Sequence, residues 1–320
     1  MPKLLEVRRL NKSFAIGAKD RLVAVDDVSF SLEAGEVLGV VGESGCGKST
    51  LVRLVARLLE PASGEIVFEG RDLAGIKAGA FARHPDRPRI QMVFQDPTDS
   101  LNPLHTAFQS IADPVKRLGS PQMQRDLQAL VERAAERVGL PLELLARRPH
   151  QLSGGQKARV GIARAIVMEP RIVILDEPTS ALDVSVQSVV LKTLARLRDE
   201  LGLAYIFVSH DLKVMQLLAN RVMVMYLGKI AETGPAQDVF AAPRHPYTQA
   251  LAASMPRITL HRERGEPGGR QHLEGEPRSP VNPNPNECRF ASRCPKVQAR
   301  CREEAPVLRG DVHGVACHFA

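Results

Sequence analysis

The pattern that most constrains the fold of this chain is GESGCGKST, residues 42–50, which lies between the apolar runs EVLGVV and LVRLVARLL. It fits G-x-x-x-x-G-K-[ST], in which a buried strand leads through a glycine-rich loop into a helix. The glycines let backbone N–H groups turn toward one anion, and the start of the helix adds the positive end of its dipole. The sequence therefore predicts a strand–loop–helix unit that holds a nucleotide by its phosphates.

Three side chains at the end of this pattern have expected roles in binding ATP and Mg²⁺. Lys48 is expected to reach the β- and γ-phosphates, Ser49 to place its hydroxyl on Mg²⁺, and Thr50 to support the phosphate cradle. The other residues expected to form the nucleotide-binding loop are Gly42, Ser44, Gly45, Cys46 and Gly47. Cys46 fills a variable position of the pattern, so we interpret it as a small residue and not as a nucleophile.

A second motif, RIVILDEPTSALD, supplies two acidic residues. Its apolar residues predict a buried strand that ends at Asp176, and ligands of open α/β sheets bind at that end of the strands. Asp176 is expected to hold Mg²⁺ through water. Glu177 follows at once and is placed to polarise the water that attacks the γ-phosphate. The two motifs together predict an enzyme that hydrolyses ATP to ADP and phosphate.

The remaining pattern predicts an α/β fold with an additional antiparallel β layer. Hydrophobic residues make up 44% of the chain and charged residues 25%, which is ordinary for a globular protein. Three early strand-like runs, separated by turns, indicate an antiparallel layer; they are residues 4–10, 21–32 and 64–70. Continuous apolar runs indicate buried parallel strands at residues 36–42, 89–94, 171–176 and 204–210. Core-facing helical stripes over residues 123–139 and 186–202 complete the pattern, with a helical insertion at about 96–165.

A second glycine-rich loop, LSGGQ at residues 152–156, precedes the helical sequence KARVGIARAI. Ser153, Gly154 and Gly155 offer a hydroxyl and free N–H groups at the start of a helix, which makes a second anion site; Gln156 completes the motif. If the helical insertion holds this loop away from the nucleotide of its own chain, the loop is useful only across a dimer interface. The alternative is an ordinary serine N-cap beside flexible glycines.

Residues 1–245 resemble an ABC-type ATPase cassette. The resemblance rests on five motifs that occur in the family's order and at about its spacing: GESGCGKST, VFQDP, LSGGQ, VILDEPTSALD and VSHD. The resemblance implies a head-to-tail dimer in which each ATP lies between the phosphate loop of one chain and the LSGGQ loop of the other. It further implies that Gln95 contacts Mg²⁺ and water, that His210 binds the γ-phosphate, and that Asp183 couples the two sites. Phe14 resembles the aromatic residue that stacks on adenine, although a core position is equally open.

The chain is more specifically similar to the ATP-binding subunits of dipeptide/oligopeptide importers, through QDPTDSLNP, SALDVSVQ, VMVMYLGKIAE and RHPYTQALAASMPR. This branch implies two transmembrane permease subunits, a second ATPase subunit that is a copy or a paralogue, and an extracytoplasmic substrate-binding protein. It places the chain as a peripheral subunit on the cytoplasmic face of the inner or plasma membrane. Peptides are the expected cargo, with nickel, glutathione and opine-like or sugar solutes as alternatives.

Proline and glycine become dense after residue 240, so we expect an ATP-binding domain over residues 1–240 and an extension over 241–320. The extension carries four cysteines with the spacing C-x5-C-x6-C-x15-C, which are Cys288, Cys294, Cys301 and Cys317. Four thiolates suit Zn²⁺ or a [4Fe–4S] cluster. No closely spaced C-x2–4-C pair occurs, which favours the cluster; zinc, and free or disulfide-paired cysteines, stay open.

Charge and hydropathy favour some classes of function over others. The net charge is +7, but no run of five basic residues occurs, so we expect no nucleic-acid partner. No apolar stretch approaches the ~20 residues of a membrane span, and the start lacks the apolar region of a secretory signal. A soluble ABC ATPase of DNA maintenance would carry a long coiled coil, and one of translation would carry two cassettes. A redox-regulated binding module is a third alternative.

Overall fold

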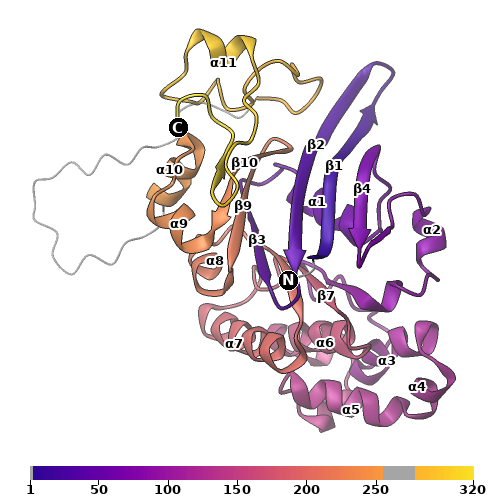
Figure 1. Ribbon diagram of the computed structural model, residues 1–320. Helices are drawn as coiled ribbons and strands as arrows, with labels where there is room; N and C mark the ends of the chain where they lie inside the picture. Colours follow the sequence, from indigo (N-terminus) through magenta and orange to yellow (C-terminus); the bar gives the residue numbers. More distant parts are fainter. Residues whose placement is uncertain (1–2, 255–277) are drawn as a thin grey trace, which may run out of the picture.

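The computed structural model describes residues 3–254 and 278–320 and contains two β-sheets with helices between and around them (Figure 1). The first sheet is antiparallel, with the strand order β2-β1-β4-β5. Its strands are β1 (Lys3–Ile16), β2 (Asp20–Glu33), β4 (Ser63–Phe68) and β5 (Arg71–Asp72). The predicted antiparallel layer is therefore present, with its first two strands longer than the apolar runs that indicated them.

The second sheet has seven strands in the order β11-β10-β9-β3-β8-β7-β6. Its strands are β3 (Val37–Val41), β6 (Ile90–Val93), β7 (Ile172–Asp176), β8 (Ala204–Val208), β9 (Arg221–Tyr226), β10 (Lys229–Pro235) and β11 (Gly314–Val315). The strands from β9 to β6 run parallel, whereas β10 and β11 pair antiparallel. Every residue of β3, β7 and β8 is buried, as the continuous apolar runs predicted.

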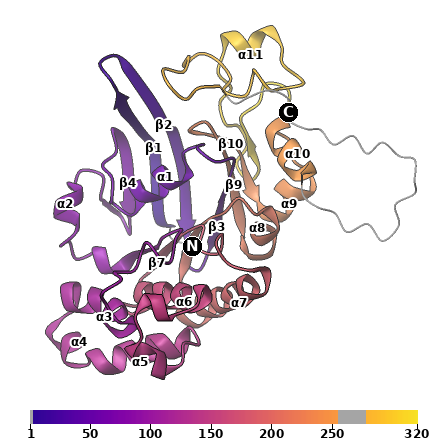
Figure 2. The same ribbon diagram turned by 180° about the vertical axis from the view of Figure 1, so that it is seen from behind.

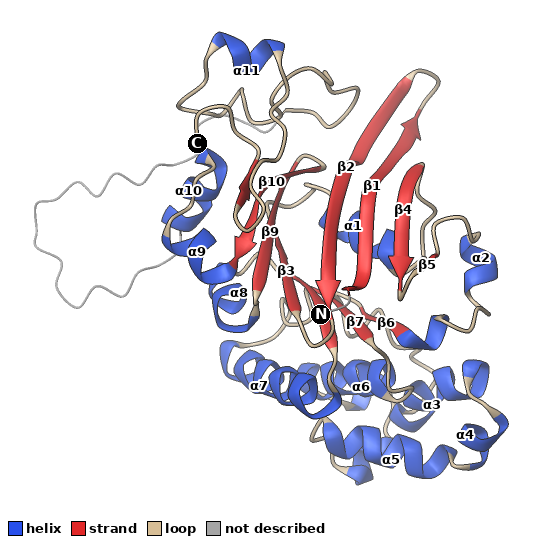
Figure 3. Ribbon diagram, in the orientation of Figure 1, coloured by secondary structure: helices blue, strands red, loops and turns tan. Residues whose placement is uncertain are grey.

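Helices cover both faces of this parallel sheet (Figure 3). Helix α1 (Lys48–Val55) packs with the antiparallel sheet on one face and shares a core with residues of both sheets. A second core on the other face contains α3 (Ala107–Leu118), α5 (Leu127–Arg137), α6 (Gly154–Ile166) and α7 (Val184–Leu201). The smaller helices are α2 (Ala78–Phe81), α4 (Pro121–Arg125), α8 (Leu212–Leu218), α9 (Ala236–Ala241), α10 (Pro246–Ala253) and α11 (Ala299–Glu303). Among residues 3–254 and 278–320, every helix is too short or too polar to span a lipid bilayer.

The helical stripe expected over residues 123–139 forms two helices and not one. Helix α4 ends at Arg125, and the backbone of Asp126 leaves the helical region before α5 begins. Aspartate is a weak helix former because its side chain competes with the backbone for local hydrogen bonds. The buried face of α5, with Val131, Ala134 and Ala135, confirms the predicted core-facing stripe.

The second described part of the extension, residues 278–320, packs back against both sheets, as Figure 2 shows from behind. Strand β11 adds an edge to the seven-stranded sheet through the pairing of Glu232 with Val315. Residues 280–282 meet the tip of the β1–β2 hairpin, where Val23 N donates to Pro280 O at 3.0 Å and Asn282 N donates to Arg21 O at 2.9 Å. The places at which the extension is attached thus include strand β10 and the tip of the β1–β2 hairpin.

Glu232 joins three chain segments at the first of these places. It is fully buried at 0% exposure. Its carboxylate accepts hydrogen bonds from the backbone N–H groups of Arg244 at 2.8 Å and His245 at 2.9 Å, and pairs with Nε2 of His313 at 2.6 Å. A buried carboxylate needs such partners, so β10, the start of α10 and the extension hold one another in place.

We predict that Glu232→Ala lowers the free energy of unfolding by about 3 kcal/mol, because it leaves the backbone N–H groups of Arg244 and His245 and the ring of His313 without their acceptor. Urea denaturation of the full chain measures this change. Glu304→Ala is the matched control: Glu304 lies on the same extension in an exposed pair with Arg300 and should leave the midpoint unchanged. Equal midpoints for the two variants would contradict the structural role of Glu232.

Candidate active site

The phosphate loop, residues 42–47, connects β3 to α1 in a conformation that requires glycine. Gly42 and Gly47 have φ angles of 152° and 105°. A Cβ at Gly47 would lie 2.1 Å from the carbonyl oxygen of Ala24 on β2, and one at Gly42 would lie 2.3 Å from that of Met225 on β9. Both backbone conformation and close packing therefore exclude a side chain, and neighbouring strands fix the shape of the loop.

Lys48 and Cys46 differ in what they offer to a ligand. The ammonium group of Lys48 is buried and donates to the carbonyl oxygens of Gly42 at 2.7 Å and Glu43 at 2.9 Å, so it lies across the loop. Burial raises the pKa of the Cys46 thiol. A thiol in that state is a poor nucleophile, in agreement with its interpretation as a small residue of the loop.

Ser49 and Asp176 meet where α1 begins and β7 ends. Asp176 is only 2% exposed, and its carboxylate accepts a hydrogen bond from Ser49 Oγ at 3.2 Å. Burial raises the pKa of Asp176, and the hydrogen bond from Ser49 opposes this rise. A hydroxyl and a buried carboxylate are hard oxygen ligands, so the donor set fits Mg²⁺, whose charge would favour the ionised carboxylate.

The side chains of Gln95, Glu177 and His210 converge on a single carboxylate oxygen. Glu177 Oε2 accepts from Gln95 Nε2 at 3.1 Å and lies 3.3 Å from His210 Nδ1. These residues follow β6, β7 and β8, which are neighbours in the parallel sheet. Glu177 also has a φ of 47°, a backbone conformation that is costly outside glycine and that is concentrated at functional sites.

The LSGGQ loop begins α6 with a reciprocal pair of hydrogen bonds. Gln156 N donates to Ser153 Oγ at 3.3 Å, and Ser153 N donates to Gln156 Oε1 at 2.8 Å, which is a capping box. A Cβ at Gly155 would lie 2.5 Å from Cγ1 of Val186, so packing against α7 requires glycine there. Ser153 and Gly154 are exposed. Figure 1 shows α6 in the helical layer and α1 between the sheets, and no hydrogen bond of the described residues joins the two loops.

Two further predicted residues lie on the surface. Phe14 on β1 is 36% exposed and belongs to neither core, so the alternative of a core position is wrong. The ammonium nitrogen of Lys12 lies 5.3 Å from the centroid of the Phe14 ring. Asp183 precedes α7 and is exposed. Both side chains are therefore accessible to a ligand or a second chain.

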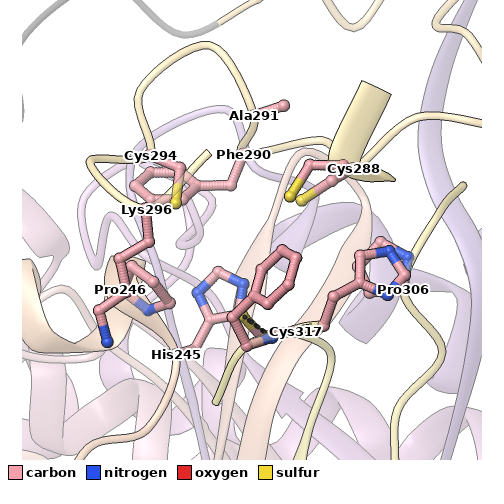
Figure 4. Close-up of a pocket in the computed structure, with 12 residues that line it drawn as sticks. His245, Pro246, Cys288, Phe290, Ala291, Cys294, Lys296, Pro306 and Cys317 are labelled. Atoms are coloured by element: carbon pink, nitrogen blue, oxygen red, sulfur yellow. Dashed lines mark hydrogen bonds between the residues drawn. The ribbon is translucent and has the colours of Figure 1, made fainter. Parts of the chain in front are cut away.

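The four cysteines of the extension line one cavity, together with His245 and Phe290 (Figure 4). Burial raises the pKa of Cys288 to about 11 and also raises the pKa of Cys294. Within residues 3–254 and 278–320, no group of three or more His, Cys, Asp or Glu residues forms an arrangement ready to hold a metal ion. The thiols are thus gathered around a common space without forming a coordination shell in this conformation.

Two residues that no sequence pattern indicated, Tyr247 and Arg293, contact the phosphate loop from outside it. Tyr247 OH accepts a hydrogen bond from Glu43 N at 2.8 Å, and Arg293 forms an ion pair with the Glu43 carboxylate. Glu43 fills a variable position of the loop pattern, and its partners lie 204 and 250 residues away along the chain. Local patterns therefore hold no signal for these contacts.

Two regions of the chain match known protein families. Residues 25–180 match the ABC transporter family, and residues 231–301 match the oligopeptide/dipeptide transporter C-terminal region. The chain is 45% identical to the oligopeptide transport ATP-binding protein AppF of Bacillus subtilis, over 99% of this chain and 97% of that protein. It is 44% identical to the dipeptide transport ATP-binding protein DppF of Escherichia coli, over 98% and 93%.

Solved structures agree with this assignment. The dimeric ATP-binding cassette MJ0796, in a post-hydrolysis state bound to ADP and Pi, has a TM-score of 0.65 and 25% identity, and the match covers 72% of this chain and 98% of that one. CbiO1 from Clostridium perfringens, part of the transporter complex cbiONQ, has a TM-score of 0.65 and 32% identity, with 76% and 92% covered. The chain is thus an ATPase of the ABC transporter family, and it belongs to the branch with the oligopeptide/dipeptide transporter C-terminal region.

Proposed function

We propose that this chain hydrolyses ATP to drive the import of dipeptides or oligopeptides through partner membrane subunits. The observation that carries the proposal is the convergence of Gln95 and His210 on Glu177, next to the pair formed by Ser49 and Asp176. The relatives named for oligopeptide and dipeptide transport match nearly the whole chain, including the extension. The alternatives of DNA maintenance and translation are not favoured.

The site residues divide the reaction between binding and water activation. Lys48 and the backbone N–H groups of the phosphate loop bind the triphosphate, and Ser49 and Asp176 hold Mg²⁺, which neutralises charge on the phosphates when it is bound. Glu177 accepts a proton from the attacking water. Gln95 and His210 hold that carboxylate and orient the water, because both already contact Glu177 Oε2.

The assembly proposed here is a head-to-tail dimer of ATPase subunits with two permeases. The exposure of Ser153, Phe14 and Asp183 supports it, since each can meet a ligand or partner without rearrangement of the chain. The subunit would lie on the cytoplasmic face of the membrane and receive cargo from an extracytoplasmic substrate-binding protein. In this proposal the ATP-binding domain ends near residue 240, and the extension of residues 241–320 follows it.

The extension is proposed to hold a metal centre at Cys288, Cys294, Cys301 and Cys317. The support is that all four thiols line the same cavity, and that the donor set fits [4Fe–4S] first and Zn²⁺ second. Burial disfavours the ionised form of Cys288, so a bound cation would be needed to hold it as a thiolate. The centre would stabilise this short segment, which has little core of its own.

We predict that Glu177→Gln lowers the ATPase rate by at least about a hundredfold while ATP binding is retained, because glutamine cannot accept the proton of the attacking water. Steady-state hydrolysis and equilibrium titration with ATP measure the two effects. Glu200→Gln, on the exposed face of α7, is the matched control and should hydrolyse at the normal rate. Normal hydrolysis by Glu177→Gln would refute the proposed role.

By contrast, Lys48→Ala should weaken ATP binding itself, which the same equilibrium titration measures.

We predict that the chain co-purifies from membranes with two permease subunits, and that its deletion abolishes uptake of labelled dipeptides or oligopeptides. Mass spectrometry of the purified complex and uptake by intact cells measure these outcomes. Uptake of nickel and of glutathione in the same cells is the specificity control. Loss of nickel or glutathione uptake with normal peptide uptake would assign that solute, and not peptides, as the cargo. Purification with ribosomes or DNA would refute the transport role.

We predict that protein purified without oxygen is brown and contains about four irons per chain. The substitution Cys294→Ser should abolish the colour and the iron, whereas Cys46→Ser, outside the cavity, should retain both. Visible absorbance and elemental analysis give the readout. A colourless protein with about one zinc per chain would assign the site to Zn²⁺, and a protein with neither metal would refute a metal centre.

A further inference from the structure

The cysteine-bearing loop of the extension reaches the phosphate loop through a partly buried ion pair. Arg293 Nη1 lies 2.8 Å from Glu43 Oε2, and Arg293 Nη2 lies 3.1 Å from Glu43 Oε1, so the pair is bidentate. The Arg293 side chain is 7% exposed and that of Glu43 is 31% exposed. Such planar, two-point contacts fix the orientation of a carboxylate far better than a single contact does.

Aromatic side chains enclose this pair and hold Glu43 at a second point. The Arg293 guanidinium lies 6.0 Å from the ring centroid of Tyr226, which in turn packs against Tyr247 and Phe290. Tyr247 OH accepts from Glu43 N at 2.8 Å. Groups from outside the phosphate loop thus hold both the backbone and the side chain of Glu43.

The rest of the extension has independent attachments that do not need Arg293. Arg289 pairs with Asp26 on β2, residues 280–282 bond to the β1–β2 tip, and His313 bonds to Glu232. Arg289 and Arg293 lie within the segment bounded by Cys288 and Cys294. Replacement of Arg293 alone should therefore release Glu43 and leave the extension in place.

We infer that Arg293 is a positioning residue for nucleotide binding, which neutralises and orients Glu43 so that the phosphate loop presents no uncompensated negative charge to the triphosphate. The inference rests on the proposed binding of ATP at this loop. Carboxylate and phosphates repel each other, and at a partly buried site water screens that repulsion only weakly. Among the described hydrogen bonds, Arg293 has Glu43 and Tyr226 as partners and does not reach Glu177, so it acts through Glu43 on affinity and not on the chemical step.

Full-length Arg293→Met should bind a non-hydrolysable Mg-ATP analogue about tenfold more weakly than the wild type, and ADP with a smaller loss because ADP carries less charge. Its KM for ATP should rise by a similar factor while kcat at saturating ATP stays within about twofold. Glu43→Gln in the same chain removes the repelling charge. The double variant Glu43→Gln/Arg293→Met should therefore regain affinity to within about threefold of Glu43→Gln alone.

Two further variants separate this role from a merely structural one. Arg293→Lys keeps the charge but loses the two-point contact and should give an intermediate affinity, which also covers failure of Arg293→Met to fold. Arg300→Ala, in an exposed pair on α11, should bind like the wild type. Unchanged affinity in Arg293→Met, or a double variant as weak as Arg293→Met, would overturn the inference. Failure of the wild type to bind the analogue would instead refute the proposed function.

Discussion

The site depends on one geometric constraint, which is that parallel strands end at a common edge of their sheet. Strands β3, β6, β7 and β8 bring their carboxyl ends together, and each delivers a different component. The phosphate loop follows β3 and Gln95 follows β6, while Asp176 ends β7, Glu177 comes directly after it, and His210 follows β8. Segments far apart in the sequence meet here because backbone hydrogen bonds fix the order and register of the strands.

Much of this arrangement could be predicted from the sequence because its signals are local. The five-residue buried strands appear as unbroken apolar runs, the helix stripes of α5 and α7 recur at helical spacing, and the glycines of the phosphate loop match a short fixed pattern. Phe14 shows the limit of such reasoning. Its neighbours in sequence left core and surface positions equally open, and only the packing of the sheet places the ring outside both cores.

What could not be predicted depends on contacts between distant segments. Proline and glycine density in the extension indicates irregular structure, but it does not reveal that Gly314–Val315 forms an edge strand or that Asn282 meets the β2 tip. The charges of Glu43 and Arg293 are individually ordinary, and charged residues make up a quarter of the chain. That these two residues pair with each other is visible only in the folded structure. The break at Asp126 is a milder case, in which a local preference divides an otherwise continuous stripe.

The separation of Glu43 and Arg293 has a consequence for biosynthesis. The two residues are 250 positions apart, so a ribosome that adds about 5–20 residues per second exposes Glu43 about 10–50 s before its arginine is made. Late in this interval, once β8 and β9 have been made, the nascent chain can pair β3 and form the phosphate loop and α1 before Arg293 reaches Glu43. The mature electrostatics of the nucleotide pocket are thus completed only in the last stage of translation.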